Sequence, residues 1–256
     1  MNAGRESIFN LPGALTAFVA LLVVIHVVRA ALLAPDVDQW VVWTFGFVPA
    51  RFDPTVLMGA RFPGGEGAKI WSFVSYALLH ADLTHLGFNA LWLLPFGSAI
   101  ARRFGAARFF LFLAVTATGG ALAHLVTHAH EIAPMIGASA AISGAMAAAT
   151  RFAFMKGSFL SMRLGDADEA ARVPALPLAR ALRNPRVIIF LAVWFGINFA
   201  FGIGSINVTN DDQNVAWQAH IGGFLAGLLL FSLFDPIPAA REARETNIRD
   251  EDEIRS

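Results

Sequence analysis

Six long apolar segments constrain the fold of this sequence more than any other feature. A helix needs roughly 20 mostly apolar residues to cross a hydrocarbon core about 30 Å thick. Segments of about this length run over Leu11–Leu33, Leu83–Ile100, Ala106–Thr127, Pro134–Phe154, Val187–Ile203 and Trp217–Phe234. The sequence therefore predicts an all-α membrane protein built as a polytopic bundle of six transmembrane helices.

The composition of the 256 residues agrees with a bilayer environment. Only 15% of the residues are charged and the mean hydropathy is +0.58, whereas soluble domains carry about 25% charged residues. Basic and acidic residues both number 19, so the net charge provides no attraction for nucleic acid. The chain has no Cys, which excludes disulfides, thiolate metal sites and Cys nucleophiles.

The basic residues predict the orientation of the helices. If the N-terminus is inside, 15 of the 19 Lys and Arg residues lie in inner segments and three lie in outer loops. Positively charged loops tend to stay cytoplasmic. We therefore expect a multi-pass protein of the bacterial inner membrane, with cytoplasmic termini over 1–10 and 235–256 and a membrane domain over 11–234.

Two connecting segments have distinct compositions. The first outer connection, Pro35–Ile70, is rich in Trp and Phe, which favour the headgroup level of a bilayer. We expect it to form an interfacial, aromatic-rich outer loop. On the inner side, Gly157–Arg186 contains several acidic and Pro residues, and we expect a solvated loop there.

Polar side chains in the apolar segments gather near the starts of the second, fourth and sixth. They include His85, Asn89, Ser139 and His220. Insertion of the least tolerated polar side chains at the bilayer centre costs about 2.5–3.5 kcal/mol of free energy. Each of these four residues is therefore a functional candidate. In the predicted topology these three segments run from outside to inside, and all four residues lie within roughly 10 Å of the outer helix ends. The sequence thus predicts one polar layer near the outer surface.

A serine and a histidine at one depth are the minimum for nucleophilic acyl transfer. His220 can accept the Ser139 proton and later protonate the leaving amine. His85 and Asn89 share one helix face through their i,i+4 spacing, and both can donate hydrogen bonds to an oxyanion. Backbone N–H groups at the start of the Ser139 helix also favour negative charge.

Structural explanations remain open for several small residues. Close helix packing in a membrane is sufficient to explain Gly137, Gly144, Gly223 and Gly227. Ser143 is expected to be a small packing residue. Another interpretation of the intramembrane polar residues is a small polytopic transporter. A transporter needs a polar path that continues to the inner side, and the inner halves of the second and sixth segments lack it.

A group of histidines ends the third segment. His124, His128 and His130 precede Glu131, and imidazole is a common metal ligand. The His-Glu-x-x-His pattern of zinc proteases is absent. We expect a polar interfacial loop rather than a metal site, and no cofactor.

At these residues the sequence resembles the rhomboid family of intramembrane serine proteases. The resemblance spans roughly Thr16–Phe234. It is carried by three elements on alternate segments: His80 with His85-x-x-x-Asn89, Gly137-Ala138-Ser139, and Ala219-His220-x-x-Gly223-x-x-x-Gly227.

The resemblance implies a serine endopeptidase with a Ser139–His220 dyad and no Asp, which cleaves single-span transmembrane proteins near the outer part of the bilayer. His85, Asn89 and the Ser139 backbone N–H would bind the oxyanion, and His80 would hold water or order the site. A substrate gate would include Phe88, Trp92, Trp194 and Phe195, and the supporting glycines are Gly137, Gly223 and Gly227. The alternative is a catalytically inactive relative that binds and escorts membrane helices. The oligomeric state is not specified by the sequence.

Two positions depart from the pattern of the family. Ala140 follows the serine where the family usually has Gly. Ser143 stands where many members have an aromatic residue that stacks on the catalytic His. We expect both departures to be compatible with activity, because every group with a chemical role is present.

Overall fold

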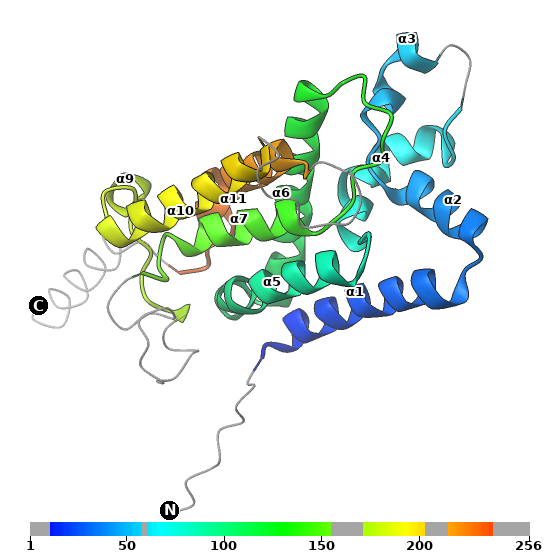
Figure 1. The fold of residues 1–256 in the computed structure, drawn as a ribbon. Coiled ribbons are helices and arrows are strands. Elements are labelled where there is room, and N and C mark those ends of the chain that lie inside the picture. Colours follow the sequence, from blue (N-terminus) through cyan, green and yellow to red (C-terminus); the bar gives the residue numbers. More distant parts are fainter. Residues whose placement is uncertain (1–10, 58–60, 155–170, 203–214, 238–256) are drawn as a thin grey trace, which may run out of the picture.

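The computed structural model describes residues 11–57, 61–154, 171–202 and 215–237. Within these ranges the ordered elements are helices, with one isolated β-bridge between Phe47 and Met135. The all-α prediction is confirmed for this part of the chain. The elements in Figure 1 are α1 (Gly13–Leu32), α2 (Pro35–Phe45), η1 (Pro49–Phe52), α3 (Pro54–Leu57), α4 (Gly65–Ser75), η2 (Tyr76–Leu78), α5 (Leu83–Phe104), α6 (Ala106–Thr127), α7 (Ser139–Ala149), α9 (Leu178–Ala181), α10 (Pro185–Gly202) and α11 (Trp217–Phe234).

Three of the described helices, α1, α6 and α11, are long and apolar enough to cross a membrane. The predicted third and sixth segments coincide with α6 and α11 at both ends. The second segment continues as α5 to Phe104, four residues beyond its predicted end. The total of six spans stays a prediction.

The fourth predicted segment differs most from the structure. Its helix, α7, has only 11 residues, which is about 16 Å, and the residues from Pro134 to Ala138 are not helical. Met135 exchanges two backbone hydrogen bonds with Phe47, of 2.8 and 3.0 Å, and Gly137 has a φ of 123°. Neither arrangement fits a helix. Ser139 is therefore the first residue of its helix and not the sixth residue of a longer span.

Local signals fix the ends of the other long helices. The Asp82 side chain caps α5 by accepting a 2.7 Å hydrogen bond from the His85 backbone N–H. Gly105, with a φ of 74°, ends α5 and precedes the first residue of α6. Two residues separate the end of α1 at Leu32 from Pro35, the first residue of α2. Pro suits the first position of a helix because no N–H is needed there.

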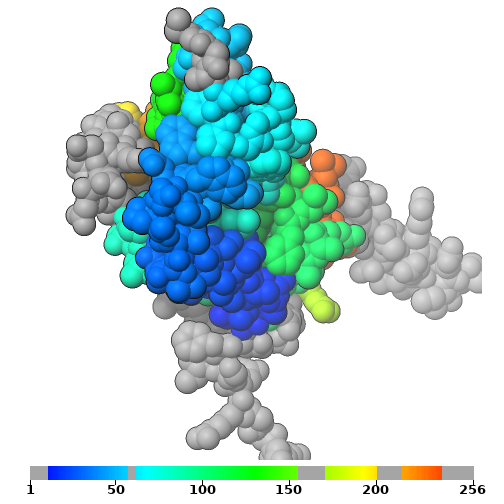
Figure 2. All heavy atoms as spheres, turned by 90° about the vertical axis from the view of Figure 1, so that its right-hand side faces the viewer, coloured from blue at the N-terminus to red at the C-terminus, as the bar shows by residue number. Residues whose placement is uncertain are grey.

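The predicted aromatic-rich outer loop is mostly helical, because α2, η1, α3 and part of α4 lie within it. The rings of Trp43 and Phe62 stack at 5.5 Å, and buried Phe47 packs against Phe73 at 5.0 Å. Figure 2 shows α1 and α2 in blue and α4 in cyan on one face, with α2 in contact with α4. This region also pairs with the segment that precedes Ser139, through Phe47 and Met135.

Two buried arginines connect helices. Arg29 of α1 donates to Asp38 of α2 at 2.7 Å and to the His80 carbonyl at 2.9 Å. Arg103 at the end of α5 pairs with Asp235, just after α11, at 2.8 Å. Both arginines are nearly completely buried. A buried charge is tolerated only when it is paired, so these contacts fix α1 near the start of α5 and the end of α5 beside the end of α11.

The centre of the bundle is a close contact of α6, α7 and α11, with α5 also packed against α7 (Figure 1). A Cβ atom at Gly223 would lie 2.0 Å from the Ala140 carbonyl oxygen, and one at Gly227 would lie 2.2 Å from that of Gly144. At these positions of α11 there is no room for a side chain. The helices are therefore in contact through their backbones.

Three predicted segments fall wholly or partly outside the described residues. They are the N-terminal segment 1–10, most of the C-terminal segment and residues 157–170 of the inner loop. The described remainder of that loop contains the short helix α9.

We predict that Gly223→Ala destabilises the protein and lowers its activity, because the added methyl group would overlap the Ala140 carbonyl. Overpacking of this kind costs about 1–3 kcal/mol. Thermal unfolding in detergent would measure the change. The matched control is Gly196→Ala on α10, where a Cβ would meet no atom within 4 Å. Equal melting temperatures for the two variants would contradict the proposed close contact.

Candidate active site

Ser139 and His220 meet at the beginnings of two helices that are in backbone contact. Ser139 is the first residue of α7 and His220 the fourth residue of α11. The Ser139 Oγ lies 2.8 Å from the His220 Nε2. Both side chains are half-buried. This distance lies within the range of a nucleophile and its general base.

A third residue, Asn198 of α10, contacts the other nitrogen of His220. The Asn198 Oδ1 lies 2.7 Å from the His220 Nδ1, and the Asn198 Nδ2 donates to the Trp194 carbonyl at 2.8 Å. A carbonyl can only accept, so the amide must direct its NH₂ group to Trp194 and its oxygen to His220. This arrangement assigns the proton to Nδ1 and leaves the lone pair of Nε2 facing the Ser139 hydroxyl.

Sequence reasoning missed Asn198. It is the only carboxamide in the predicted segment Val187–Ile203, and a polar side chain in such a segment is a functional candidate. The signal was therefore present. Its contact with His220, 22 residues further along the chain, depends on the packing of α10 against α11.

His85 lies beside the loop that precedes Ser139. A Cβ at Gly137 would be 2.6 Å from the His85 Nε2 and 3.8 Å from the Ser139 Oγ. The backbone N–H of Ala81 donates to the His85 Nδ1 at 3.5 Å, which assigns the ring proton to Nε2. The structure thus places an N–H donor of α5 next to Gly137 and the start of α7. The same space requirement, together with its positive φ, explains why residue 137 is Gly.

Asn89 and His80 both contact His85 in the structure. The Asn89 Nδ2 donates to the His85 carbonyl one turn earlier at 3.0 Å, and the side chain is buried. The amide has a second hydrogen that this bond does not use. His80 is 1% exposed, and its ring packs edge-on against that of His85 at 5.1 Å.

The two positions that depart from the family pattern have clear local environments. The Ser143 Oγ donates to the Ser139 carbonyl at 2.7 Å, within the same helix. Ala140 is buried, and a Cβ at Gly120 of α6 would approach its methyl group to 2.5 Å. The contact on the Nδ1 side of His220 is made by Asn198.

The four predicted gate residues do not share one environment. Phe88 and Trp92 of α5 and Phe195 of α10 are 41–47% exposed. Trp194 is 7% exposed and stacks on Phe224 of α11 at 4.3 Å. Two other rings, Phe96 of α5 and Phe190 of α10, contact each other at 5.7 Å.

These residues form a polar group with complementary roles. It combines a hydroxyl, an imidazole with its lone pair toward that hydroxyl, an amide that orients the imidazole, and a second imidazole N–H close to the same loop. Backbone N–H groups in the first turn of α7 have no carbonyl partner within that helix. The arrangement is suited to attack on a carbonyl group and to stabilisation of the resulting oxyanion.

Comparison with known proteins gives a consistent family assignment. A family model described as a rhomboid domain matches residues 67–235. The chain is 28% identical over 157 residues to the rhomboid protease GluP of Bacillus subtilis. It is 26% identical over 180 residues to the rhomboid protease GlpG of Serratia proteamaculans, and 26% identical over 165 residues to the mitochondrial RHOMBOID-like protein 12 of Arabidopsis thaliana.

The matched regions cover much of this chain and less of the relatives. They include 61% of this chain for GluP, 70% for GlpG and 62% for the plant protein. Of the relatives themselves they cover 24%, 54% and 44%, respectively. The family model, over residues 67–235, covers most of α4 and the helices from α5 to α11.

Proposed function

Since the chain belongs to the rhomboid family, we propose that it is an intramembrane serine endopeptidase with Ser139 as nucleophile and His220 as general base. The observation that carries this proposal is the 2.8 Å contact between the Ser139 Oγ and the His220 Nε2. The relatives GluP and GlpG are named rhomboid proteases. An inactive protein that only binds and escorts helices would not need this contact, so that alternative is not favoured.

In the proposed first step, His220 Nε2 removes the Ser139 proton as Oγ attacks the scissile carbonyl carbon. The electron pair of the C=O bond moves to the oxygen and gives a tetrahedral oxyanion. His85 Nε2–H, the free N–H of the Asn89 amide and the N–H groups at the start of α7 would donate to it. Removal of one such donor typically lowers kcat about 10²–10³-fold.

In the following steps His220 acts first as a general acid and then again as a general base. The imidazolium gives its proton to the amine as the C–N bond breaks, which leaves an acyl ester on Ser139. Water then loses a proton to Nε2 and attacks the ester, and the Ser139 oxygen recovers the proton as it leaves. The Nδ1 proton stays on the ring throughout, so the catalytic pair is Ser139 and His220.

Asn198 is a positioning residue in this scheme. Its oxygen accepts from Nδ1 and keeps Nε2 unprotonated and directed at Ser139. In many relatives, as the resemblance implies, an aromatic residue at the position of Ser143 supports the histidine ring. In this chain the bond from α10 takes over that support.

The proposed membrane arrangement follows from the charge distribution and the apolar helices. Six spans over residues 11–234 would leave residues 1–10 and 235–256 in the cytoplasm, because 15 of 19 basic residues then lie inside. The starts of α5, α7 and α11 would then face the outer side of a bacterial inner membrane. The aromatic side chains of residues 35–70 would lie at the outer interface.

The proposed substrates are single-span membrane proteins. Their helix would approach between α5 and α10, past the exposed rings of Phe88, Trp92 and Phe195. Trp194 would support this approach from within the protein, where it stacks on Phe224. A peptide bond within a helix is shielded by its hydrogen bond, so the segment must unwind locally before Ser139 can reach its carbonyl. A position near the outer surface supplies the water that hydrolysis requires.

We expect Ser139→Ala and His220→Ala each to lower cleavage of a single-span reporter in proteoliposomes by about 10⁴-fold or more, since each removes one half of the acid–base pair. Ser143→Ala is the matched control, because it deletes a hydroxyl one turn further along α7 that donates to the Ser139 carbonyl of the same helix. It should cleave at close to the wild-type rate. Undiminished cleavage by either catalytic variant would refute the assignment.

We expect Asn198→Leu to lower kcat about 10- to 100-fold with little change in KM, because the imidazole loses its orienting acceptor. Asn198→Asp should recover, at high pH, much of the activity that Asn198→Leu loses. It should also move the acidic limb of the pH–rate profile to higher pH, since a carboxylate stabilises the imidazolium. Phe199→Leu, at a neighbouring exposed position of α10, is the control. Superimposable pH profiles and wild-type kcat in both Asn198 variants would exclude the positioning role.

A further inference from the structure

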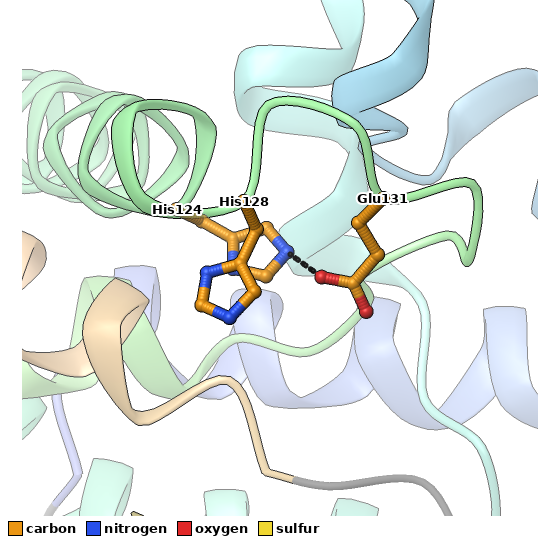
Figure 3. A group of neighbouring side chains, drawn as sticks. All are labelled: His124, His128 and Glu131. Atoms are coloured by element: carbon orange, nitrogen blue, oxygen red, sulfur yellow. Dashed lines mark ion pairs between the residues drawn. The ribbon is translucent and has the colours of Figure 1, made fainter. Parts of the chain in front are cut away.

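A second polar cluster lies at the C-terminal end of α6. His124 and His128 are one turn apart on the same helix face, and their rings stack with centroids 4.9 Å apart. The Glu131 backbone N–H donates to the His128 carbonyl at 3.0 Å, in the turn that follows the helix. This turn directs the Glu131 carboxylate back toward the two rings (Figure 3). The Glu131 Oε2 lies 3.4 Å from the His124 Nε2.

Two buried atoms of this cluster have no hydrogen-bond partner among the described residues. They are the Nδ1 of His124, a residue that is only 4% exposed, and the Oε2 of Glu131. Buried polar atoms are nearly always satisfied in native proteins. Among the described residues the Glu131 Oε2 has its 3.4 Å ion pair with the His124 Nε2 but no hydrogen bond, and the His124 Nδ1 has no hydrogen bond either. The cluster therefore has unused capacity for one further polar group or ion.

We propose that His124, His128 and Glu131 bind one transition-metal ion of the zinc type. One nitrogen of each histidine and one oxygen of Glu131 all lie within 4.8 Å of one another. Tetrahedral zinc with bonds of about 2.0–2.2 Å separates its ligands by about 3.3–3.6 Å. Side-chain rotation would therefore have to bring the three atoms closer, and His128 would exchange one of its present contacts, with Thr127 or Gln218, for the ion. Two imidazoles and one carboxylate suit Zn²⁺ and are unfavourable for Ca²⁺ or Mg²⁺, which prefer oxygen ligands.

His130 does not belong to this site, although its spacing suggests the same role. Its Nδ1 contacts the Asp53 carboxylate on the other side of the loop. Hydrogen bonds from the side chain and backbone of Thr55 lower the pKa of Asp53 to about 2, so Asp53 is a charged partner for His130 at neutral pH. The loop thus directs Glu131 toward α6 and His130 away from it.

The position of the cluster gives the ion a structural role. Glu131 is the first residue of the segment that leads to Ser139. Within this segment Met135 pairs with Phe47. Its carbonyl also accepts from the Ala50 N–H at 3.0 Å. On the other side, the His128 Nε2 lies 3.5 Å from the Gln218 Nε2, two residues before His220. A bound ion would hold the end of α6 and this loop together, next to the starts of α7 and α11.

The test is a metal titration of the full chain, purified in detergent without a histidine tag, in the Ser139→Ala background. We expect one equivalent of Zn²⁺ to bind, Co²⁺ to give the visible absorption of a low-coordinate site, and Zn²⁺ at 100 times its Kd to raise Tm by about 5 °C or more. His128→Asn and Glu131→Gln should abolish all three signals, and His130→Asn should retain them. Because no cleavage is measured, the result is independent of the proposed protease activity.

Two results would overturn the proposal. One is the absence of saturable Zn²⁺ and Co²⁺ binding, which would leave His124 and Glu131 as a simple ion pair. The other is binding that survives both His128→Asn and Glu131→Gln, or that is lost in His130→Asn, because the ion would then lie elsewhere. His124 is not used as a variant, since it is buried in α6 and its replacement can disturb folding.

Discussion

The backbone contact between α7 and α11 is the constraint on which the site depends. Gly223 leaves space for the Ala140 carbonyl, and Gly227 for that of Gly144. On α7, Ser139 directly precedes the contact residue Ala140. On α11, His220 lies about one turn before the contact residue Gly223. The spacing that packs the helices therefore also sets the 2.8 Å distance between Oγ and Nε2. In a bilayer, where apolar side chains gain little from helix association, small residues at helix contacts provide such precision.

The polar groups of the site are made compatible with an apolar bundle by bonds within their own helices. Asn198 donates to the Trp194 carbonyl and Asn89 to the His85 carbonyl, each four residues back. These bonds reduce the cost of burying an amide. They also fix the direction of each side chain, which for Asn198 leaves Oδ1 as the acceptor for His220. The hydrogen bond from Asn198 to the Trp194 carbonyl thus both lowers the free-energy cost of burying Asn198 and leaves its oxygen available to His220.

The sequence predicted well the features that depend on local composition. The apolar segments Ala106–Thr127 and Trp217–Phe234 coincide with helices. Gly105, His128 and Asp235 interrupt the apolar pattern at three of their four ends. The segment Pro134–Phe154 was predicted too long. Its first residues are held outside α7 by pairing with Phe47, 88 positions earlier in the chain, which no local pattern reveals.

The same distinction applies to the polar residues. Ser139 and His220 could be selected because both stand near the starts of apolar segments, and the structure brings them together. Asn198 was visible as an isolated amide, but its partner was not. At the end of α6, the sequence grouped His130 with His124 and His128. In the structure His130 instead contacts Asp53, 77 residues away in the sequence, and Glu131 lies beside His124.

The most direct measurement of the central claim is covalent labelling of the purified chain with a fluorophosphonate, followed by mass spectrometry of the adduct. A serine activated by a neighbouring imidazole reacts with this reagent, whereas an ordinary hydroxyl does not. The account predicts a single adduct on Ser139 that is lost in His220→Ala. The absence of an adduct on Ser139, or labelling that is independent of His220, would contradict it.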